Sequence, residues 1–213
     1  MTRPNILLII ADGMQAEAVD PGHPCLTPSL DALAQRGVRF RRARTTCTTC
    51  SPARASLLTG MLPHNHGVLE VEHGRDDDQC VLRTEYPHFA PKLGEVGYRT
   101  GYFGKWHVER SQDVSRFGWQ ESVVKGAAHV KNIGKGDQGP ATFTLDESLC
   151  GYIEGPRGYR RILHWGVTDT PIDERYQGLT VLDAERFLGE KLTGDDPWCC
   201  CVSFSEPNEA LVA

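Results

Sequence analysis

Continuous apolar runs alternate along the chain with stretches of helical periodicity. Residues 6–11 form one such run, as expected for a strand covered on both faces of a parallel sheet. Further strands are predicted over residues 98–103 and 198–204. Because helical patterns separate these runs, we predict an α/β fold with a mainly parallel sheet flanked by helices.

Four helices are predicted between and after these strands, over residues 28–36, 51–59, 89–96 and 173–192. The first has Thr27 as its N-cap and Pro28 at its first helical position. Leu30 and Leu33 supply its apolar stripe. Ser51 starts the second helix in the same way, with proline following. Residues 38–44 are predicted to be extended, and residues 125–158 to form loops and short strands.

Composition narrows the class of protein. The chain has 213 residues, 39% apolar and 24% charged, which is enough apolar material for one sizeable domain. Its 23 basic and 28 acidic residues give a net charge of −5. No block of lysine or arginine occurs, so we expect no nucleic-acid partner.

The N-terminal apolar run carries no targeting signal. It is too short for the core of a signal peptide and ends directly at Asp12. No stretch is long enough to span a membrane. We therefore expect a cytoplasmic protein with no membrane partner, whose eight cysteines are reduced thiols.

Cys50 and Arg54 form the clearest chemical signal in the sequence. Cys50 precedes a predicted helix N-terminus, where backbone N–H groups and the helix dipole stabilise negative charge. Arg54 lies one turn later on the same side. Such a place activates a nucleophile and receives an anionic group. A buried structural cysteine, or a redox pair of Cys47 and Cys50, remains an alternative.

Three further side chains are candidates on position and spacing. Asp12 ends the first strand, so it is either a strand-end cap or an oxygen ligand for a hard divalent cation. Lys105 and His107 are two residues apart in chain predicted to be extended, which places both on one face. They either present a cation and a proton donor to one anion, or are a solvated lysine and a structural histidine.

The segment Cys50-Ser51-Pro52-Ala53-Arg54, followed by Leu58-Thr59-Gly60, resembles the signature of the type I sulfatases. These enzymes have an alkaline-phosphatase-like α/β fold. Other segments resemble the same family, at residues 3–12, 27–40, 63–68, 98–107 and 117–119. The resemblance covers residues 3–120 and returns over residues 174–207.

The resemblance implies hydrolysis of a sulfate ester. In this family a separate maturation enzyme oxidises the signature cysteine to Cα-formylglycine, whose hydrate attacks sulfur. Cys50, Arg54, Lys105 and His107 are then the expected catalytic residues, and Lys105 and His107 also bind substrate. The expected metal ligands are Asp12 and the modified Cys50. The metal is expected to be Ca²⁺, with Mg²⁺ or Mn²⁺ as alternatives.

Two positions depart from the family pattern. Gly13 stands where sulfatases commonly have a second acidic residue after Asp12, which bears on the metal ligands. Asn208 stands where many sulfatases have a substrate-binding histidine. An amide still hydrogen-bonds an anion but does not act as a general acid. Asn208 is either a substrate-binding residue or an ordinary loop residue.

The length of the chain acquires a meaning beside this family. Sulfatases bring further metal ligands and another lysine from well beyond residue 213. We therefore expect residues 1–213 to be the N-terminal part of a single catalytic domain, with its C-terminal part absent and little activity alone. The apolar run over residues 198–204 is expected to lie uncovered.

The substrate is expected to be a sulfate-ester small molecule or saccharide. Three other functions remain open. Thr45 and Thr46 before the signature resemble the branch of phosphonate monoester hydrolases, so a phosphonate or phosphate monoester is an alternative substrate. Cys47 and Cys50 permit a thiol oxidoreductase. The third is an inactive fragment that only binds anions.

Overall fold

Four parallel strands form the main sheet of the computed structural model, which describes residues 3–71, 76–124, 145–154, 162–191, 194–207 and 211–212. The strands are β1 (Ile6–Asp12), β2 (Arg99–Gly104), β3 (Glu121–Val124) and β6 (Trp198–Pro207). Their order is β1-β6-β2-β3, and every neighbouring pair is parallel. The predicted α/β fold with a mainly parallel sheet is confirmed.

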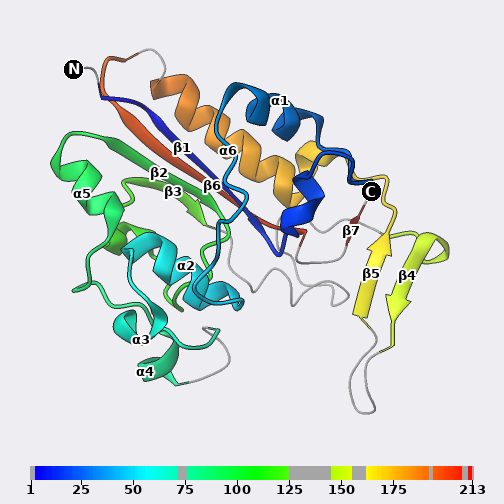
Figure 1. The fold of residues 1–213 in the computed structure, drawn as a ribbon, viewed down its shortest axis with the longest axis horizontal. Helices are drawn as coiled ribbons and strands as arrows, with labels where there is room; N and C mark the ends of the chain where they lie inside the picture. The colour runs from blue at the N-terminus through cyan, green and yellow to red at the C-terminus, as the bar shows by residue number, and fades with distance from the viewer. Residues whose placement is uncertain are drawn as a thin grey trace.

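Helices lie on both sides of this sheet (Figure 1). On one side are α2 (Cys50–Thr59) and α5 (Phe89–Glu95), and on the other is α6 (Tyr176–Lys191). The other helices are α1 (Pro28–Arg36), α3 (Pro63–His66), α4 (Asp77–Cys80) and the short 3-10 helices η1 (Ala16–Val19), η2 (Val114–Phe117), η4 (Glu147–Leu149) and η5 (Ile172–Glu174). No helix in the described ranges is long and apolar enough to cross a bilayer.

A small second sheet stands beside the main one (Figure 1). Its strands are β4 (Cys150–Ile153), β5 (Ile162–Gly166) and β7 (Leu211–Val212), in that order. Strands β4 and β5 are antiparallel, whereas β5 and β7 are parallel. Two of these short strands fall within or beside the predicted loop-rich region, whose residues 125–144 and 155–158 lie outside the described residues.

The core has two layers because strand residues point alternately to opposite faces. On one face, Cys199 and Cys201 of β6 pack with Tyr102 of β2 beneath α2 and α5. On the other face, Cys200 of β6 packs with Phe187 of α6. The three consecutive cysteines are therefore small apolar core residues on both sides of the sheet.

Strand β6 is covered, contrary to the expectation that this apolar run lies exposed. It is hydrogen-bonded between β1 and β2, and Cys199 to Cys201 are fully buried. The order of parallel strands decides this, because β6, the last strand of the main sheet in the sequence, inserts between β1 and β2. Strand β1 lies at the edge instead, and its Leu7 and Ile9 are 49% and 55% exposed.

Residues 28–44 differ from the prediction because no other part of the described chain covers them. Helix α1 forms as predicted, but none of its residues is buried, and Leu33 of its apolar stripe is 57% exposed. Residues 38–44 form no strand. Within the described residues nothing packs against either segment closely enough to bury it.

Several helix boundaries also shift slightly. Helix α2 begins at Cys50 with Thr49 as N-cap, one residue before the predicted start. Helix α6 begins at Tyr176, because the preceding residues form the separate turn η5. Helix α5 and strand β2 lie within one residue of their predicted ranges.

Candidate functional site at the carboxyl edge of the parallel sheet

Polar groups of Asp12, Lys105 and Ser203 meet at one edge of the main sheet, near the carboxyl ends of three strands. Asp12 is the last residue of β1, Lys105 directly follows β2, and Ser203 lies in the second half of β6. Because these strands are parallel neighbours, their carboxyl ends share one edge, which is where ligands bind in open α/β sheets.

Arg54 of α2 connects all three strand ends. Its Nη2 donates to Asp12 Oδ2 at 3.0 Å. Its Nη1 donates to Ser203 Oγ at 2.7 Å and to the Lys105 carbonyl oxygen at 3.0 Å. The planar guanidinium thus uses its fixed fork of donors to hold the helix on the sheet edge.

Lys105 adds a second cation to the same carboxylate. Its Nζ lies 2.8 Å from Asp12 Oδ2, the oxygen that Arg54 also contacts. The side chains of Arg54, Lys105 and Asp12 are 6%, 7% and 11% exposed. These ion pairs therefore form largely away from water, where charges interact strongly.

The pKa shifts follow from these contacts. Burial alone would raise the pKa of Asp12, but the hydrogen bond from Lys105 and the charge of Arg54 outweigh it and lower that pKa. Burial alone would lower the pKa of Arg54, but its interactions with Tyr102 and Asp12 raise it. The three groups therefore include an ionised carboxylate and a guanidinium that stays charged.

Cys50 lies at the entrance of this arrangement. It is the first residue of α2, is partly buried, and precedes Arg54 by one helical turn. Nearby Cys47 accepts a hydrogen bond on Sγ from the Thr49 backbone N–H at 3.4 Å. Position 50 therefore lies at the start of a ten-residue helix, in the positive end of its dipole, where a nucleophilic group would be stabilised.

Lys105 and His107 do not lie in extended chain, so the prediction that they share a strand face is wrong. Strand β2 ends at Gly104, whose φ is 98°, and His107 has a φ of 53°. Only glycine fits at position 104, because a Cβ there would lie 2.1 Å from the Ser203 carbonyl oxygen of the closely approaching β6. Both Lys105 and His107 are nevertheless 5% exposed.

Two residues of the site were absent from the sequence-based candidates. Ser203 accepts from Arg54, and Tyr102 donates through its hydroxyl to the Lys105 carbonyl at 2.6 Å. Both are at most 1% exposed. A signal for Ser203 existed, since it is the first polar residue after the apolar run of β6 and lies toward the carboxyl end.

His66 is a buried residue that supports helix α2. Its Nε2 lies 3.0 Å from Ser56 Oγ, and its Nδ1 accepts from the Val68 backbone N–H at 3.1 Å. It joins α2 to the segment that follows α3, and it is fully buried. It therefore supports the helix that carries Cys50 and Arg54.

The fit of a divalent metal rests on Asp12. Oxygen Oδ2 binds the two cations, so Oδ1 is the oxygen suited to a metal. In the part of the chain that the structure describes, no group of three or more His, Cys, Asp or Glu side chains is placed to hold an ion. Gly13 supplies no carboxylate, and its φ of 68° favours glycine. Asp12 therefore fits as one ligand of a divalent ion.

Asn208 lies outside the described residues, although the preceding strand ends at the same edge as Asp12. Asp12 pairs with Pro207 in the register of β1 and β6. The sequence-predicted Asp12, Arg54 and Lys105 are therefore in direct contact, while Cys50 and His107 lie on the adjoining helix start and turn.

The sequence is similar to those of known sulfatases. The family model described as Sulfatase matches residues 4–209. Choline-sulfatase of Rhizobium meliloti is 29% identical over 230 residues, covering 99% of this chain and 40% of that protein. Human N-sulphoglucosamine sulphohydrolase is 40% identical over 110 residues, covering 49% of this chain and 20% of that protein.

A solved structure shares the fold. The phosphonate monoester hydrolase of Agrobacterium radiobacter superimposes with a TM-score of 0.65 at 22% identity, covering 96% of this chain and 41% of that chain. The chain thus spans less than half the length of each of these three proteins. Since the family model matches nearly all of its residues, this chain belongs to the sulfatase family.

Proposed function

We propose that this chain carries the nucleophile and the anion-binding half of an enzyme that hydrolyses sulfate esters. The observation that carries the proposal is the charge at the sheet edge. Two nearly buried cations, Arg54 and Lys105, face the single carboxylate of Asp12 beside the start of α2. One positive charge is left over in a low-dielectric place, which favours an anionic group.

Each of these residues has a task toward a bound sulfate ester. Lys105 neutralises negative charge that develops on the sulfate oxygens. Arg54 holds the nucleophilic group at position 50 against the sheet edge and stabilises its negative charge. His107, on the turn after Lys105, donates a proton to the oxygen of the departing alcohol or phenol.

Two groups beyond the twenty amino acids complete the proposal. Oxidation of Cys50 to formylglycine by a maturation enzyme supplies a hydrated aldehyde as the nucleophile. A divalent cation, Ca²⁺ in the first place or else Mg²⁺ or Mn²⁺, supplies Lewis-acid polarisation of the sulfate. Asp12 and the modified residue 50 are the proposed ligands.

The proposed substrate is a sulfated small molecule or saccharide. The names of two relatives, choline-sulfatase and N-sulphoglucosamine sulphohydrolase, include both kinds. The organic part is recognised by loops that vary among enzymes of one fold. Asn208 is proposed to hydrogen-bond the anion, in place of a histidine.

Mass spectrometry of the peptide that spans Cys50 tests the modification. After co-expression with a formylglycine-generating enzyme, conversion of the thiol to an aldehyde lowers the peptide mass by 18 Da, about the mass of one water. The matched control is Cys47→Ser, which keeps the modified position and should be converted equally. An unmodified thiol at Cys50 in every preparation contradicts the proposed nucleophile.

Parallel turnover of an aryl sulfate and an aryl phosphonate separates the two ester classes. We expect the aryl sulfate to be the better substrate of the matured protein, measured as kcat/KM. Preference for the phosphonate would assign this chain to the alternative of a phosphonate monoester hydrolase. A thiol oxidoreductase would instead lose its activity in Cys47→Ser, whereas a sulfatase would keep it.

A further inference from the structure

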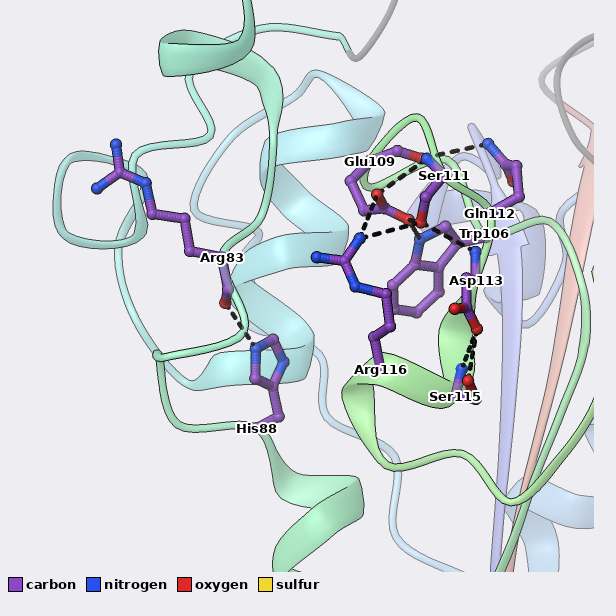
Figure 2. Close-up of polar contacts among 9 residues, drawn as sticks. All are labelled: Arg83, His88, Trp106, Glu109, Ser111, Gln112, Asp113, Ser115 and Arg116. Atoms are coloured by element: carbon purple, nitrogen blue, oxygen red, sulfur yellow. Dashed lines mark hydrogen bonds and ion pairs between the residues drawn. The ribbon is translucent and has the colours of Figure 1, made fainter.

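A buried carboxylate lies two residues after His107 and is used by none of the steps above. Glu109 is 2% exposed. Its Oε1 accepts from Trp106 Nε1 at 3.2 Å and from Ser111 Oγ at 2.7 Å, and its Oε2 accepts from the Ser111 backbone N–H at 2.9 Å (Figure 2). Arg116 Nη1 lies 3.9 Å from Oε2. A carboxylate removed from water requires such partners.

The bond between Trp106 and Glu109 closes a loop around His107. The two side chains flank residues 107 and 108 in the sequence, and their contact ties the ends of this turn together. Within the turn, His107 has a φ of 53°, in the left-handed region. A residue with a Cβ pays about 1–2 kcal/mol for that conformation and keeps it only where its surroundings impose it.

Trp106 is itself held from two sides. Its ring packs edge-on against Tyr102, with 5.2 Å between the ring centroids. It also packs in a tilted arrangement against Phe117, again with 5.2 Å between the centroids. The hydroxyl of Tyr102 donates to the Lys105 carbonyl oxygen. The indole of Trp106 is therefore packed between two aromatic rings, and one of these, Tyr102, also contacts Lys105, which binds Asp12. Trp106 itself begins the turn that carries His107.

The residues after Glu109 are connected to Trp106 through a series of hydrogen bonds and a ring contact. Ser111 Oγ accepts from the Asp113 backbone N–H at 3.1 Å. Asp113 in turn caps η2 by accepting from the Ser115 backbone N–H, and η2 ends with Phe117, which packs on Trp106. Figure 2 shows Glu109, Ser111 and Asp113 joined in this order beside the indole.

We propose that Glu109 is a positioning residue that holds His107 in place through Trp106 and the closed turn between them. The inference rests on the proposed function, in which His107 donates the proton to the departing oxygen. Glu109 does not touch the reacting atoms in this proposal. It determines where the imidazole stands by fixing both ends of a four-residue turn.

Two conservative variants test this position. Trp106→Phe keeps an aromatic ring against Tyr102 and Phe117 but lacks the indole N–H. Glu109→Gln keeps the shape but cannot accept from the Ser111 backbone N–H with its amide nitrogen. The matched control is Glu95→Gln, which alters an exposed ion pair with Lys92.

The first readout is the NMR signals of the histidine rings, and it requires no activity. We expect both variants to shift the ring signals of His107 and to leave those of His66, which is also buried, unchanged. Unchanged His107 signals overturn the proposal. Equal shifts of both histidines also overturn it, because they indicate general loss of structure.

The second readout is the dependence of hydrolysis on the leaving group in the matured protein. Misplacing a proton donor should lower kcat/KM by about 10- to 100-fold for a sulfate ester of a weakly acidic phenol. The loss should be less than about 3-fold for 4-nitrophenyl sulfate, whose leaving group needs no proton. The double variant should lose no more than the worse single variant.

Equal losses for both esters overturn the proposal, because they indicate a role unrelated to the proton donor. Where wild type hydrolyses neither ester, the proposed function fails, and the histidine signals still decide whether Glu109 positions His107. If Glu109→Gln fails to fold, Trp106→Phe alone carries both readouts, since it removes one hydrogen bond and keeps a ring.

Discussion

At the scale of single residues, Asp12 Oδ2 is the centre of the site. It contacts Arg54 and Lys105 at 3.0 and 2.8 Å, and Arg54 reaches two further acceptors. Each of these contacts joins a different strand or helix. These charges therefore have two effects. They hold helix α2 against the strand ends, and in the proposed function they bind an anion.

Arg54→Lys is expected to lower kcat/KM of the matured protein by about 100-fold or more. One ammonium group cannot replace a planar fork that reaches Asp12, Ser203 and the Lys105 carbonyl at once. The matched control is Arg186→Lys in α6, where the exposed Arg186 forms an ion pair with Asp183 at 3.1 Å. Equal activity of both variants would contradict the role of the guanidinium.

Asp12→Asn is expected to lower the free energy of unfolding by about 3 kcal/mol, because it leaves two nearly buried cations without a carboxylate. Denaturation in urea measures this loss. Added sulfate should restore more stability to this variant than to wild type, since the anion then takes the place of the lost charge. A loss below about 0.5 kcal/mol would mean that the ion pairs contribute little.

Two buried histidines predict a dependence of stability on pH. Burial lowers the pKa of both His66 and His88 below the ordinary value of 6.5. Below about pH 6.5 the unfolded chain therefore binds protons that the folded chain does not. As the pH is lowered further, the free energy of unfolding decreases until the folded histidines are also protonated. His66→Gln should make this fall less steep between pH 6.5 and 5. An unchanged slope would assign the pH dependence to other groups.

At the scale of secondary-structure elements, the turn after β2 decides the geometry of the site. Gly104 allows β6 to approach so closely that the Ser203 carbonyl accepts from the Lys105 backbone N–H at 2.8 Å. Residues after this contact leave the strand direction, and Lys105 reaches Asp12 at the end of β1, on the far side of β6. The ladder between β2 and β6 and the ion pair are thus built by the same turn.

Gly104→Ala is expected to destabilise the fold by more than about 3 kcal/mol, because it combines a strained φ with a steric overlap. Gly60→Ala is the matched control, since Gly60 also has a positive φ, 72°, but no atom within 4 Å of an added Cβ. That control should cost about 1 kcal/mol. Urea denaturation of both variants gives the comparison, and similar losses would show that the close approach is unimportant.

At the scale of the whole molecule, one side of the edge strand is apolar and uncovered. Leu7 and Ile9 of β1 point to the face that carries α6, which covers β2 and β6 but not β1. Leu33 of α1 and Phe40 are also exposed, at 57% and 79%. Apolar patches of this kind mark surfaces that bind other protein or apolar groups.

The isolated 213-residue chain is expected to bind the dye ANS through this surface. Ile9→Thr and Leu33→Gln should each lower the dye fluorescence and change the free energy of unfolding by less than about 0.5 kcal/mol, because both side chains are already exposed. Val202→Thr, at a position 7% exposed in the core, should instead cost more than about 1 kcal/mol. Unchanged fluorescence in both surface variants would locate the dye elsewhere.

Much of the chain's organisation follows from local sequence. The apolar runs predicted strands β1, β2 and β6, because a buried parallel strand needs apolar residues on both faces. Thr27, Pro28 and the glycine at position 37 predicted α1 through the preferences of helix ends. The signature from Cys50 to Gly60 pointed to the family, and it placed two of the candidate site residues, Cys50 and Arg54, at the start of one helix.

Other features depended on contacts between distant residues. The insertion of β6 between β1 and β2, which covers the cysteine run, follows from strand order and is written in no local pattern. The need for glycine at position 104 comes from the close approach of Ser203 on β6, and the bond between Trp106 and Glu109 joins the two sides of the turn that contains His107. Sequence alone therefore determined the main strands and helices and the family resemblance, because these rest on local preferences and on a contiguous motif. Tertiary structure decided where the charges meet and how His107 is held, because those outcomes are set by packing across the sheet.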